Sequence, residues 1–508
     1  MTSFDTVIIG GGHNGLVAAA YLAKAGKKVL LLERLDYFGG AATSIEAFKG
    51  IPARLSRYSY LVSLLPKQII EDLGLEVELA PRRYSSYTPN PHGEGGLLID
   101  RNDQTATKRS FESIGSGDFV SWNSFYSETT ELAKNLFPTV LSPLKSRSEV
   151  ISQLGPLSKF IEKPIGELIE ESFESDLVRG VVLTDALIGT FAENVDSTMQ
   201  ASKCFLYHVI GGETGDWNIP VGGMGAITSS MKKAAQSFGA ELISNAEVTS
   251  LTEDGKVTYS LAGESHEVTA EFVLANVARP ELARLLGKSS PKSEGAQVKV
   301  NMLLKRLPKL KEELDPVAAF GGTFHINENY SQLQTAFEQA SRGEIPDPLP
   351  CEIYCHSLTD PSILSAELRE QGVQTLTVFA LHTPHSILGS DNEAMREKLQ
   401  QAVIDSLNSV LDEDIIDLLL EDADGNPCIE TKTTKDLEDA LRLPGGNIFH
   451  EPLSWPFAED DESLESAAER WGVSTGYERI YFCGSSARRG GAVSGIAGHN
   501  AAMAVLES

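Results

Sequence analysis

Residues 2–40 read TSFDTVIIGGGHNGLVAAAYLAKAGKKVLLLERLDYFGG, and this stretch decides the fold of the chain. An apolar run at residues 4–9 predicts a buried strand. An Ala- and Leu-rich run at residues 16–25 then predicts a helix that ends at Gly26. A second apolar run at residues 29–32 predicts another strand. Strand, helix and strand in this order are typical of a βαβ unit with a parallel sheet.

The turn between the first strand and the helix carries Gly10, Gly12 and Gly15 at the G-x-G-x-x-G spacing. The first glycine permits a tight turn, the second lets a pyrophosphate approach the backbone, and the third lets the helix pack closely on the strand. The helix N-terminus adds amide donors, and Glu33 after the second strand is placed to hold a ribose hydroxyl. This register predicts a dinucleotide site; the alternative is a glycine-rich turn in another kind of α/β unit.

The residues that follow Glu33 indicate which dinucleotide is bound. Glu33, Arg34, Gly39 and Gly40 form an E-R-x-x-x-x-G-G run. The run resembles the FAD-binding signature of the flavoprotein superfamily that holds amine oxidases and phytoene desaturases. An acidic residue at this position also disfavours the 2′-phosphate of NADP. We therefore predict FAD as the cofactor, with Arg34 and Gly40 among the residues that bind it.

Composition excludes several classes of partner. The chain has 508 residues, 43 basic and 71 acidic, with a net charge of −28, which disfavours nucleic acid and limits membrane contact to the periphery. The sequence has no run of 18 apolar residues, and the first strand begins too early for a signal peptide. The five cysteines form no C-x-x-C pair, so we predict a cytoplasmic protein with no redox dithiol and no metal site.

Three further segments carry a family resemblance. They are ARLSRYSYLVSLL at residues 53–65, YSSYTPN at residues 84–90 and PGGNIFH at residues 444–450. Together with the tail at residues 477–502, they resemble one subgroup of the phytoene-dehydrogenase-like FAD flavoproteins. The sequence departs from better-known members at Ala41, where those proteins usually carry an arginine beside the pyrophosphate. This departure weakens any transfer of their substrates to this chain.

Residues 217–280 resemble the second FAD segment of that superfamily. They predict a helix at 227–238, strands at 241–244, 247–251 and 272–276, and a hairpin around Asp254 and Gly255. The resemblance implies that the strand with Val248 contacts the adenine through its backbone. An ordinary α/β repeat fits the periodicity equally well.

The tail is the second strong signal in the chain. A strand at 479–483 stops at Gly484, and Gly490 and Gly491 are predicted to open an Ala-rich helix at Ala492. The amides at the start of such a helix suit the flavin C2 carbonyl. The predicted flavin-binding residues of the tail are Gly484, Gly491, Ala492 and Val493.

The predicted fold is α/β, with a Rossmann-like FAD-binding domain of the GR2 flavoprotein type and an inserted α+β substrate domain. The FAD domain is assigned to residues 1–75, 216–290 and 441–508, and the substrate domain to residues 76–215 and 291–440. The first insert is predicted to be mostly helical, at 121–136, 154–173 and 177–188. The stretch His208–Gly215 lacks the first glycine of a second fingerprint, so no NAD(P)H domain is predicted.

The predicted function is FAD-dependent, two-electron dehydrogenation of a small apolar substrate, which the family resemblance implies to be isoprenoid-like. The alternatives are a flavin amine oxidase and a flavoprotein in which structural FAD supports partner binding. Two residues are candidates for catalysis. His450 either serves as acid, base or substrate orienter at the flavin or fixes a loop by hydrogen bonds. Lys299 is a candidate because the amine oxidases that the sequence resembles place a lysine near flavin N5; the alternative is a solvated strand lysine. His13 is interpreted as a packing or solvent-facing residue near the phosphates.

Overall fold

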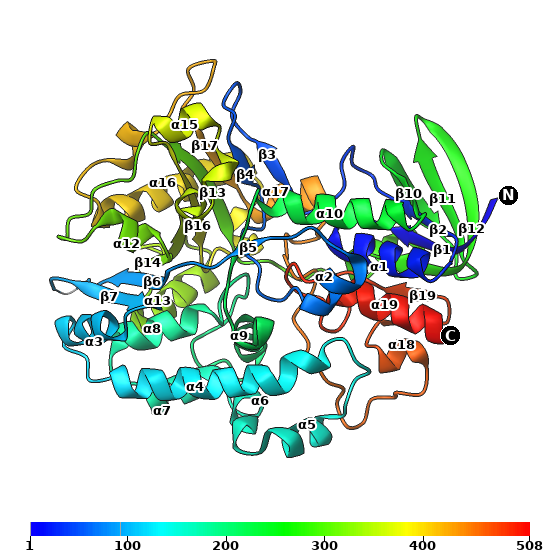
Figure 1. Ribbon diagram of the computed structural model, residues 1–508, viewed down its shortest axis with the longest axis horizontal. Helices are drawn as coiled ribbons and strands as arrows, with labels where there is room; N and C mark the ends of the chain where they lie inside the picture. Colours follow the sequence, from blue (N-terminus) through cyan, green and yellow to red (C-terminus); the bar gives the residue numbers. More distant parts are fainter. Residues whose placement is uncertain (1, 92) are drawn as a thin grey trace.

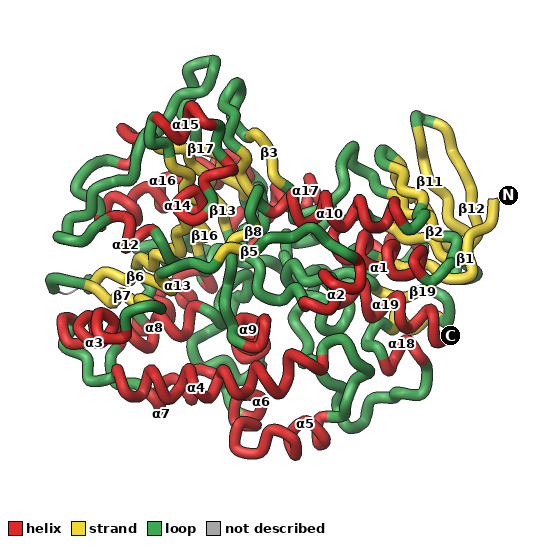
Figure 2. The backbone as a smooth tube through the Cα atoms, viewed as in Figure 1, coloured by secondary structure: helices red, strands yellow, loops and turns green. Residues whose placement is uncertain are grey.

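Two β-sheets and a layer of helices make up the molecule, as the computed structural model shows for residues 2–91 and 93–508 (Figures 1 and 2). The first sheet lies at the right of Figure 1, the second sheet at the upper left, and the helical layer below the second sheet. No helix in the described part of the chain is long and apolar enough to cross a membrane.

The first sheet has eight strands and is built on the βαβ unit of the N-terminus. Its main path is β10-β11-β12-β1-β2-β9, with β19 beside β12 and β18 beside β19. The pairs β1·β12, β1·β2, β2·β9 and β12·β19 are parallel, as expected for a dinucleotide-binding sheet. Its strands are β1 Thr2–Ile9, β2 Val29–Leu32, β9 Glu241–Ile243, β10 Ala246–Leu251, β11 Lys256–Leu261, β12 Glu264–Ala275, β18 Ser474–Tyr477 and β19 Ile480–Phe482.

Three helices stack beside this sheet: α1 His13–Lys24, α10 Met224–Ser237 and α19 Ile496–Glu507. Helix α1 contacts both of the others, and its alanines are fully buried. The approach of α19 is close, since a Cβ at Gly498 would lie 2.0 Å from the backbone oxygen of Asn14. Small residues on both helices therefore bring the C-terminus of the chain against its first helix.

The second sheet has seven strands in the order β17-β13-β16-β15-β14-β6-β7. All neighbours are antiparallel except β14 and β6. Helix α16, Asn392–Val410, packs on the sheet through Leu399, Val403 and Leu407. The strands are β6 Tyr84–Pro89, β7 Gly96–Asp100, β13 Val298–Leu304, β14 Thr323–Ile326, β15 Cys351–Tyr354, β16 Gln374–Ala380 and β17 Ile429–Lys432.

The helical layer has its own core of aromatic and aliphatic side chains, centred on Phe125, Phe160 and Phe205. Its helices are α3 Gln104–Ser113, α4 Phe119–Leu136, α5 Arg147–Leu154, α6 Lys159–Glu162, α7 Ile165–Ser172, α8 Asp176–Thr184 and α9 Gln200–Ile210. Shorter elements complete the fold: β3 Ser44–Glu46, β4 Arg54–Ser56, α2 Lys67–Leu73, β5 Leu79–Ala80, β8 Ile219–Pro220, α11 Arg279–Leu285, α12 Pro316–Phe320, α13 Tyr330–Ser341, α14 His356–Thr359, α15 Ala366–Glu370, α17 Thr434–Leu441 and α18 Ala467–Arg470.

Two helix predictions are wrong. The continuous helix at 154–173 is instead broken into α5, α6 and α7, because Gly155 adopts a φ of +54° and Pro164 cannot donate a helical hydrogen bond. The tail helix begins at Ile496 rather than Ala492, after Gly495 with a φ of +77°. In both places the chain has a glycine in the left-handed region, where a helix ends or has not yet begun.

The two sheets draw on different parts of the chain. Strands of the first sheet come from residues 2–32, 241–275 and 474–482, and strands of the second from residues 84–100 and 298–432. These ranges fall inside the segments assigned to the two domains. The domain boundaries themselves stay a prediction.

His382 gives a prediction about stability and pH. It is fully buried near Phe191 and Phe337, and neither ring nitrogen has a hydrogen-bond partner among the described residues. Burial lowers its pKa to about 3, so the unfolded chain binds a proton that the folded chain does not as the pH falls below about 6.5. His382→Asn removes this titration, and asparagine tolerates the φ of +51° at this position.

We expect the loss in unfolding free energy between pH 7 and pH 5 to be smaller in His382→Asn than in the wild type by about 2 kcal/mol. Urea denaturation at both pH values measures it. The same substitution at His266, a half-exposed residue of β12, controls for the loss of a histidine as such. If the loss in unfolding free energy between pH 7 and pH 5 is the same in His382→Asn as in the wild type, His382 accepts a proton in the folded state.

Candidate active site

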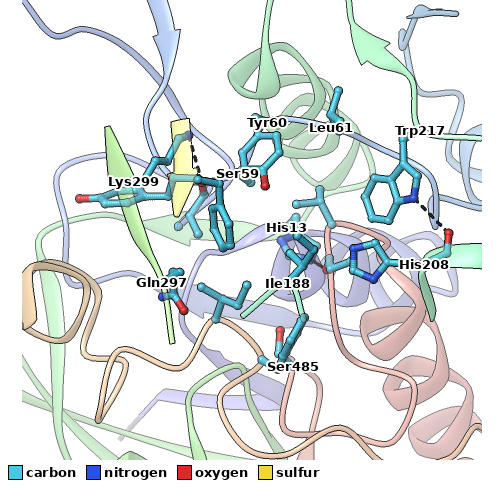
Figure 3. A pocket seen from close by; sticks show the side chains of 18 of the residues that line it. His13, Ser59, Tyr60, Leu61, Ile188, His208, Trp217, Gln297, Lys299 and Ser485 are labelled. Carbon is cyan, nitrogen blue, oxygen red and sulfur yellow. Dashed lines mark hydrogen bonds between the residues drawn. The ribbon is translucent and has the colours of Figure 1, made fainter. Parts of the chain in front are cut away.

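A cavity of about 650 Å³ runs from the glycine turn of the first sheet to the inner face of the second sheet. Its wall includes Gly12 from the N-terminal turn, Asn276 after β12, and Ala492 from the tail. Figure 3 shows Lys299 at one side of the cavity, His208 and Trp217 at the other, and Tyr60 and His13 between them. The N-terminal glycine turn, the residue after β12 and the tail, which are far apart in the sequence, therefore meet at one end of the cavity.

Most of the predicted cofactor-binding residues lie on the wall of this cavity. The structure places eight of them there: Gly10, Gly12, Glu33, Arg34, Gly40, Val248, Ala492 and Val493. Gly15, Gly484 and Gly491 do not line it, and each packs behind the wall instead. A Cβ at Gly15 would lie 2.3 Å from the Gly10 oxygen, one at Gly484 2.5 Å from Asn276 Oδ1, and one at Gly491 2.8 Å from Leu453. These three glycines permit close packing, which leaves their direct contact with a cofactor a prediction.

Glu33 closes β2 with its carboxylate at the cavity. Oε2 accepts a hydrogen bond from the Gly11 amide at 2.6 Å, and Oε1 accepts one from the Leu35 amide at 2.8 Å. The side chain is 8% exposed, and burial raises the pKa of its carboxyl group. The two amides hold the carboxylate beside the glycine turn, where the sequence pattern predicts a ribose contact.

Asn276 is a site residue that the sequence analysis missed. Its Nδ2 donates to the Gly10 oxygen at 3.0 Å, and its atoms are the nearest neighbours of Gly10, Gly12 and Gly484. It follows β12 directly and lines the cavity. The signal that could have identified Asn276 is its position directly after a strand, because the residue after a parallel strand lies at the edge of the sheet where ligands bind.

The tail meets the cavity as a loop. Ala492 has a φ of +62°, and its carbonyl oxygen lies 3.1 Å from His13 Nε2. His13 therefore ties the glycine turn to the tail, and burial lowers its pKa to about 4. Helix α19 begins four residues after Ala492, so its N-terminus, which is the positive end of the helix dipole, does not lie at Ala492. Loop backbone at Ala492 and Val493 forms this part of the wall.

Lys299 is not a solvated strand lysine, so that interpretation is wrong. Its side chain is 3% exposed, lines the cavity and donates to the carbonyl oxygens of Ser56 at 2.7 Å and Tyr58 at 3.1 Å. Its Nζ also lies 4.9 Å from the centre of the Tyr60 ring (Figure 3). Burial lowers the pKa of Lys299 to about 7, so the amine changes charge near neutral pH.

His450 also lines the cavity. Its φ is +67°, and its Nδ1 is buried with no hydrogen-bond partner among the described residues. Burial and the nearby His13 lower its pKa to about 4, so the ring is neutral at pH 7. A neutral ring with an unpaired nitrogen at the cavity is able to accept a proton. Its role in catalysis stays a prediction.

The end of the cavity beside the second sheet carries ionisable side chains that the sequence analysis did not single out. They are Arg82, Asp185, His325 and Glu352. They come from four separate places in the chain, so no local motif marks them. The pairing of β14 with β15 brings His325 beside Glu352, and tertiary packing brings Arg82, which precedes β6, and Asp185, which follows α8, to the same place.

Comparison with known proteins places the chain among oxidoreductases. Residues 8–67 match a family model described as an NAD(P)-binding Rossmann-like domain. The Mycobacterium tuberculosis protein Rv0897c is 52% identical over 520 residues, which cover 99% of this chain and 97% of that protein. Pyridine nucleotide-disulfide oxidoreductase domain-containing protein 2 of Mus musculus is 28% identical, with 99% and 93% covered. Prolycopene isomerase of Daucus carota is 23% identical, with 80% and 66% covered.

Solved structures show the same fold. An oxidoreductase from Methanosarcina mazei aligns with a TM-score of 0.57 and 15% identity, covering 99% of each chain. Putrescine oxidase bound to putrescine aligns with a TM-score of 0.57 and 16% identity, covering 100% of this chain and 99% of that one. The Rossmann-like fold and the resemblance to phytoene-dehydrogenase-like flavoproteins are thus confirmed. The chain belongs to the family of the mycobacterial protein Rv0897c, a group of oxidoreductases related to pyridine nucleotide-disulfide oxidoreductase domain-containing protein 2.

Proposed function

We propose that the protein is an FAD-dependent dehydrogenase that oxidises a small organic substrate in the cavity between its two sheets. The observation that carries the proposal is the meeting of Gly12, Asn276 and Ala492 on one wall. A pyrophosphate fits beside Gly12, because the glycine has no side chain to fill that space and α1 directs its amides there. Glu33 would hold the ribose, and Val248 would face the adenine.

The substrate end of the cavity supports oxidation of an organic molecule. Bound FAD would supply a two-electron acceptor, and the protein's part is to bind, orient and exchange a proton. Lys299, whose pKa is about 7, and His450, whose ring is neutral at pH 7, are the candidates for proton exchange near the cofactor. Ionisable side chains on the second sheet favour a substrate with polar groups over a pure hydrocarbon. Oxidation of an amine, the class of substrate in the name of putrescine oxidase, is therefore the second candidate.

The test is anaerobic mixing of the purified protein with panels of polyenes and amines, after FAD has been identified by extraction. Bleaching of the flavin absorbance by one class supports dehydrogenation of that class. FAD that no substrate bleaches, together with a tightly bound protein partner, would support a structural role for the cofactor. Absence of FAD from a folded preparation that also fails to bind added FAD would contradict the proposal. A cytoplasmic location is part of the same proposal, on the basis of charge and cysteine usage.

Reduction by NADPH is expected to be absent. The stretch His208–Gly215 spans the end of helix α9 and the turn after it, whereas a nucleotide fingerprint follows a strand. It lines the substrate end of the cavity instead. Rapid mixing of the FAD-loaded protein with NADPH under anaerobic conditions measures this, and we expect no bleaching on the time scale of turnover. Prompt bleaching would reveal a nicotinamide site.

Lys299 is expected to set the pH dependence of flavin reduction. Its pKa of about 7 means that the amine becomes neutral, and able to accept a proton, as the pH rises through neutrality. The rate of reduction by substrate should therefore rise through pH 7 in the wild type, and this rise should vanish in Lys299→Met. Lys432→Met is the matched control, because Lys432 pairs with Lys299 on the next strand and also lines the cavity. A rise that persists in Lys299→Met would assign the titration to another group.

A further inference from the structure

A row of side chains crosses the second sheet on the side that faces the cavity. Lys299 on β13 pairs with Phe379 on β16, Phe379 with Glu352 on β15, and Glu352 with His325 on β14. All four residues line the cavity. Because neighbouring strands lie about 4.8 Å apart, Glu352 is about 10 Å from Lys299 along the row and His325 about 14 Å. The row thus runs from a basic end, through an aromatic ring, to an acidic end.

The acidic end is a buried cluster of three carboxyl groups and one imidazole. His325 Nδ1 is hydrogen-bonded to Glu328 Oε2 at 2.5 Å and lies 4.0 Å from Glu352 Oε1. Tyr354 donates its hydroxyl to Glu352 Oε2 at 2.5 Å. Glu328, His325 and Glu352 are at most 5% exposed. Asp185, after α8, reaches the same cavity from the helical layer.

Hydrogen-bond acceptors outnumber donors in this cluster. Glu328 Oε1 is buried with no partner, and the Asp185 carboxylate makes no hydrogen bond, among the residues that the structure describes. Arg82 is the nearby cation, but its Nε donates to the Trp217 oxygen at 3.1 Å and its Nη1 to Thr323 Oγ1 at 2.9 Å. An ionised carboxylate only accepts hydrogen bonds, so a ligand that brings N–H donors together with a positive charge suits these carboxyl groups.

Aromatic rings surround the same space. The ring of Tyr60 lies 4.7 Å from that of Tyr354 and 5.9 Å from that of Phe379, measured between centroids. The faces of such rings attract cations, and Tyr60 already has the Lys299 ammonium 4.9 Å from its centroid. Unpaired carboxyl groups together with aromatic faces are the chemistry that recognises a cationic nitrogen.

We propose that the acidic end of the cavity, formed by Asp185, His325, Glu352 and Tyr354 and backed by Glu328 at His325, binds a cationic nitrogen group of the substrate. The substrate then carries an ammonium group, or a similar cation with several N–H donors, about 10 Å from the part that lies beside Lys299. This inference rests on the proposed function, because it describes the end of the substrate that lies farthest from the FAD-binding end of the cavity. A hydrocarbon in this place would leave the carboxyl groups buried without partners.

A divalent metal ion is the competing ligand. Ligand atoms of His325, Glu328 and Glu352 all lie within 4.8 Å of one another. However, the His325 nitrogen near the carboxylates is already bonded to Glu328, and a metal would have to displace that hydrogen bond. An ammonium group requires no such displacement, because it donates directly to the free carboxylate oxygens.

The cluster also predicts that cation binding releases a proton. Burial raises the pKa of Asp185 to about 6 and that of Glu352 to about 8, and it raises the pKa of Glu328 well above its usual range. Glu352 is therefore protonated in the free protein at neutral pH, and a cation favours its ionised form. Affinity should increase with pH up to about 8 and level off above it. The titratable and charged groups that face Glu352 are Tyr60, Arg82, Asp185, His325, Glu328 and Tyr354.

The test compares two probes of equal length on the FAD-loaded protein by isothermal titration calorimetry. Hexylamine and 1-hexanol share the same carbon chain and differ in charge. We expect the wild type to bind hexylamine roughly 10- to 100-fold more tightly than 1-hexanol, as for hydrogen bonds to charged groups. Glu352→Gln keeps the shape of the side chain but cannot ionise when the cation binds, so it should reduce this preference to near unity. Asp185→Asn should reduce it as well.

The matched control is Glu170→Gln. Glu170 accepts a hydrogen bond from the Tyr330 hydroxyl at 2.7 Å, as Glu352 does from Tyr354, but it lies on the exposed side of α7 and does not line the cavity. Its variant should keep the wild-type preference. Should Glu352→Gln fail to fold, Asp185→Asn decides, because the Asp185 carboxylate has no hydrogen-bond partner among the described residues that the substitution would remove.

Two results would overturn the inference. One is equal affinity for the two probes in the wild type, or a preference that survives both substitutions. The other is one Zn²⁺ bound per chain, lost in Glu328→Gln and competing with hexylamine, which would assign the cluster to a metal. FAD content and flavin reduction are measured on the same preparations. Missing FAD contradicts the proposed function, whereas normal flavin reduction without amine selectivity contradicts this inference alone.

Discussion

Gly12→Val is expected to abolish FAD binding while leaving the protein folded. Gly12 has a φ of −67°, which valine adopts without strain, so the backbone of the turn has no reason to change. Its Cβ would lie 3.1 Å from Asn276 Nδ2, and the two methyl groups beyond it would enter the cavity beside the first amides of α1. Loss of two charge-assisted hydrogen bonds from a pyrophosphate at this point weakens binding roughly 100-fold or more.

The measurement is the flavin content of the purified protein, followed by titration of the apoprotein with FAD. Gly117→Val is the matched control, since Gly117 is exposed and an added Cβ there meets no atom within 4 Å. Circular dichroism and thermal unfolding show whether both variants keep their fold. Full flavin occupancy in folded Gly12→Val would place the cofactor elsewhere than the glycine turn.

The part of the fold that could be predicted from the sequence is the part that is local in the chain. The strand, glycine turn, helix and second strand at residues 2–32 occupy nearly the predicted bounds, because each depends on neighbouring residues. The predicted helix at 227–238 corresponds to α10, and the predicted strands at 241–244 and 247–251 correspond to β9 and β10. Periodicity and turn residues suffice for such elements.

The parts that could not be predicted depend on long-range pairing. Asn276 reaches Gly10 across 266 positions of sequence, and the pairing of β14 with β15 sets His325 beside Glu352. Lys299 looked like an exposed residue of an amphipathic strand, yet every residue of β13 is buried, since helix α16 covers one face of the sheet and the other faces the cavity. A strand that is covered on both faces carries no alternation that would have indicated its environment.

The start of the tail helix was predicted wrongly for a different reason. Its composition correctly indicated a helix, but Ala492 and Gly495 both adopt positive φ, and α19 begins only at Ile496. Alanine is the best helix former, so propensity alone predicts an earlier start. The loop at 490–495 is held instead by tertiary contacts, among them the contact between His13 and the Ala492 oxygen. Contacts of this kind override local preference near a binding site.

His450→Ala is expected to keep FAD and the fold but to slow flavin reduction by the true substrate. The side chain lines the cavity and does not belong to the glycine turn, so the cofactor wall stays intact without it. Its pKa of about 4 keeps the ring neutral at pH 7, with Nδ1 free to accept a proton as the substrate is oxidised. Removal of a group that transfers a proton in the rate-determining step costs roughly 10²–10⁴-fold in rate.

Rapid mixing with the substrate under anaerobic conditions measures the reduction rate, and the flavin spectrum reports occupancy before mixing. His266→Ala is the control, since His266 lies on β12 outside the cavity. The pH profile separates His450 from Lys299. A proton acceptor with a pKa of about 4 stays active down to mildly acidic pH, whereas Lys299 changes charge near pH 7. The slow rate of His450→Ala should therefore persist at every pH between 6 and 9, because His450 is neutral across that range. Wild-type kinetics in His450→Ala would assign the residue to its loop, where its amide donates to the Asn447 oxygen at 3.0 Å.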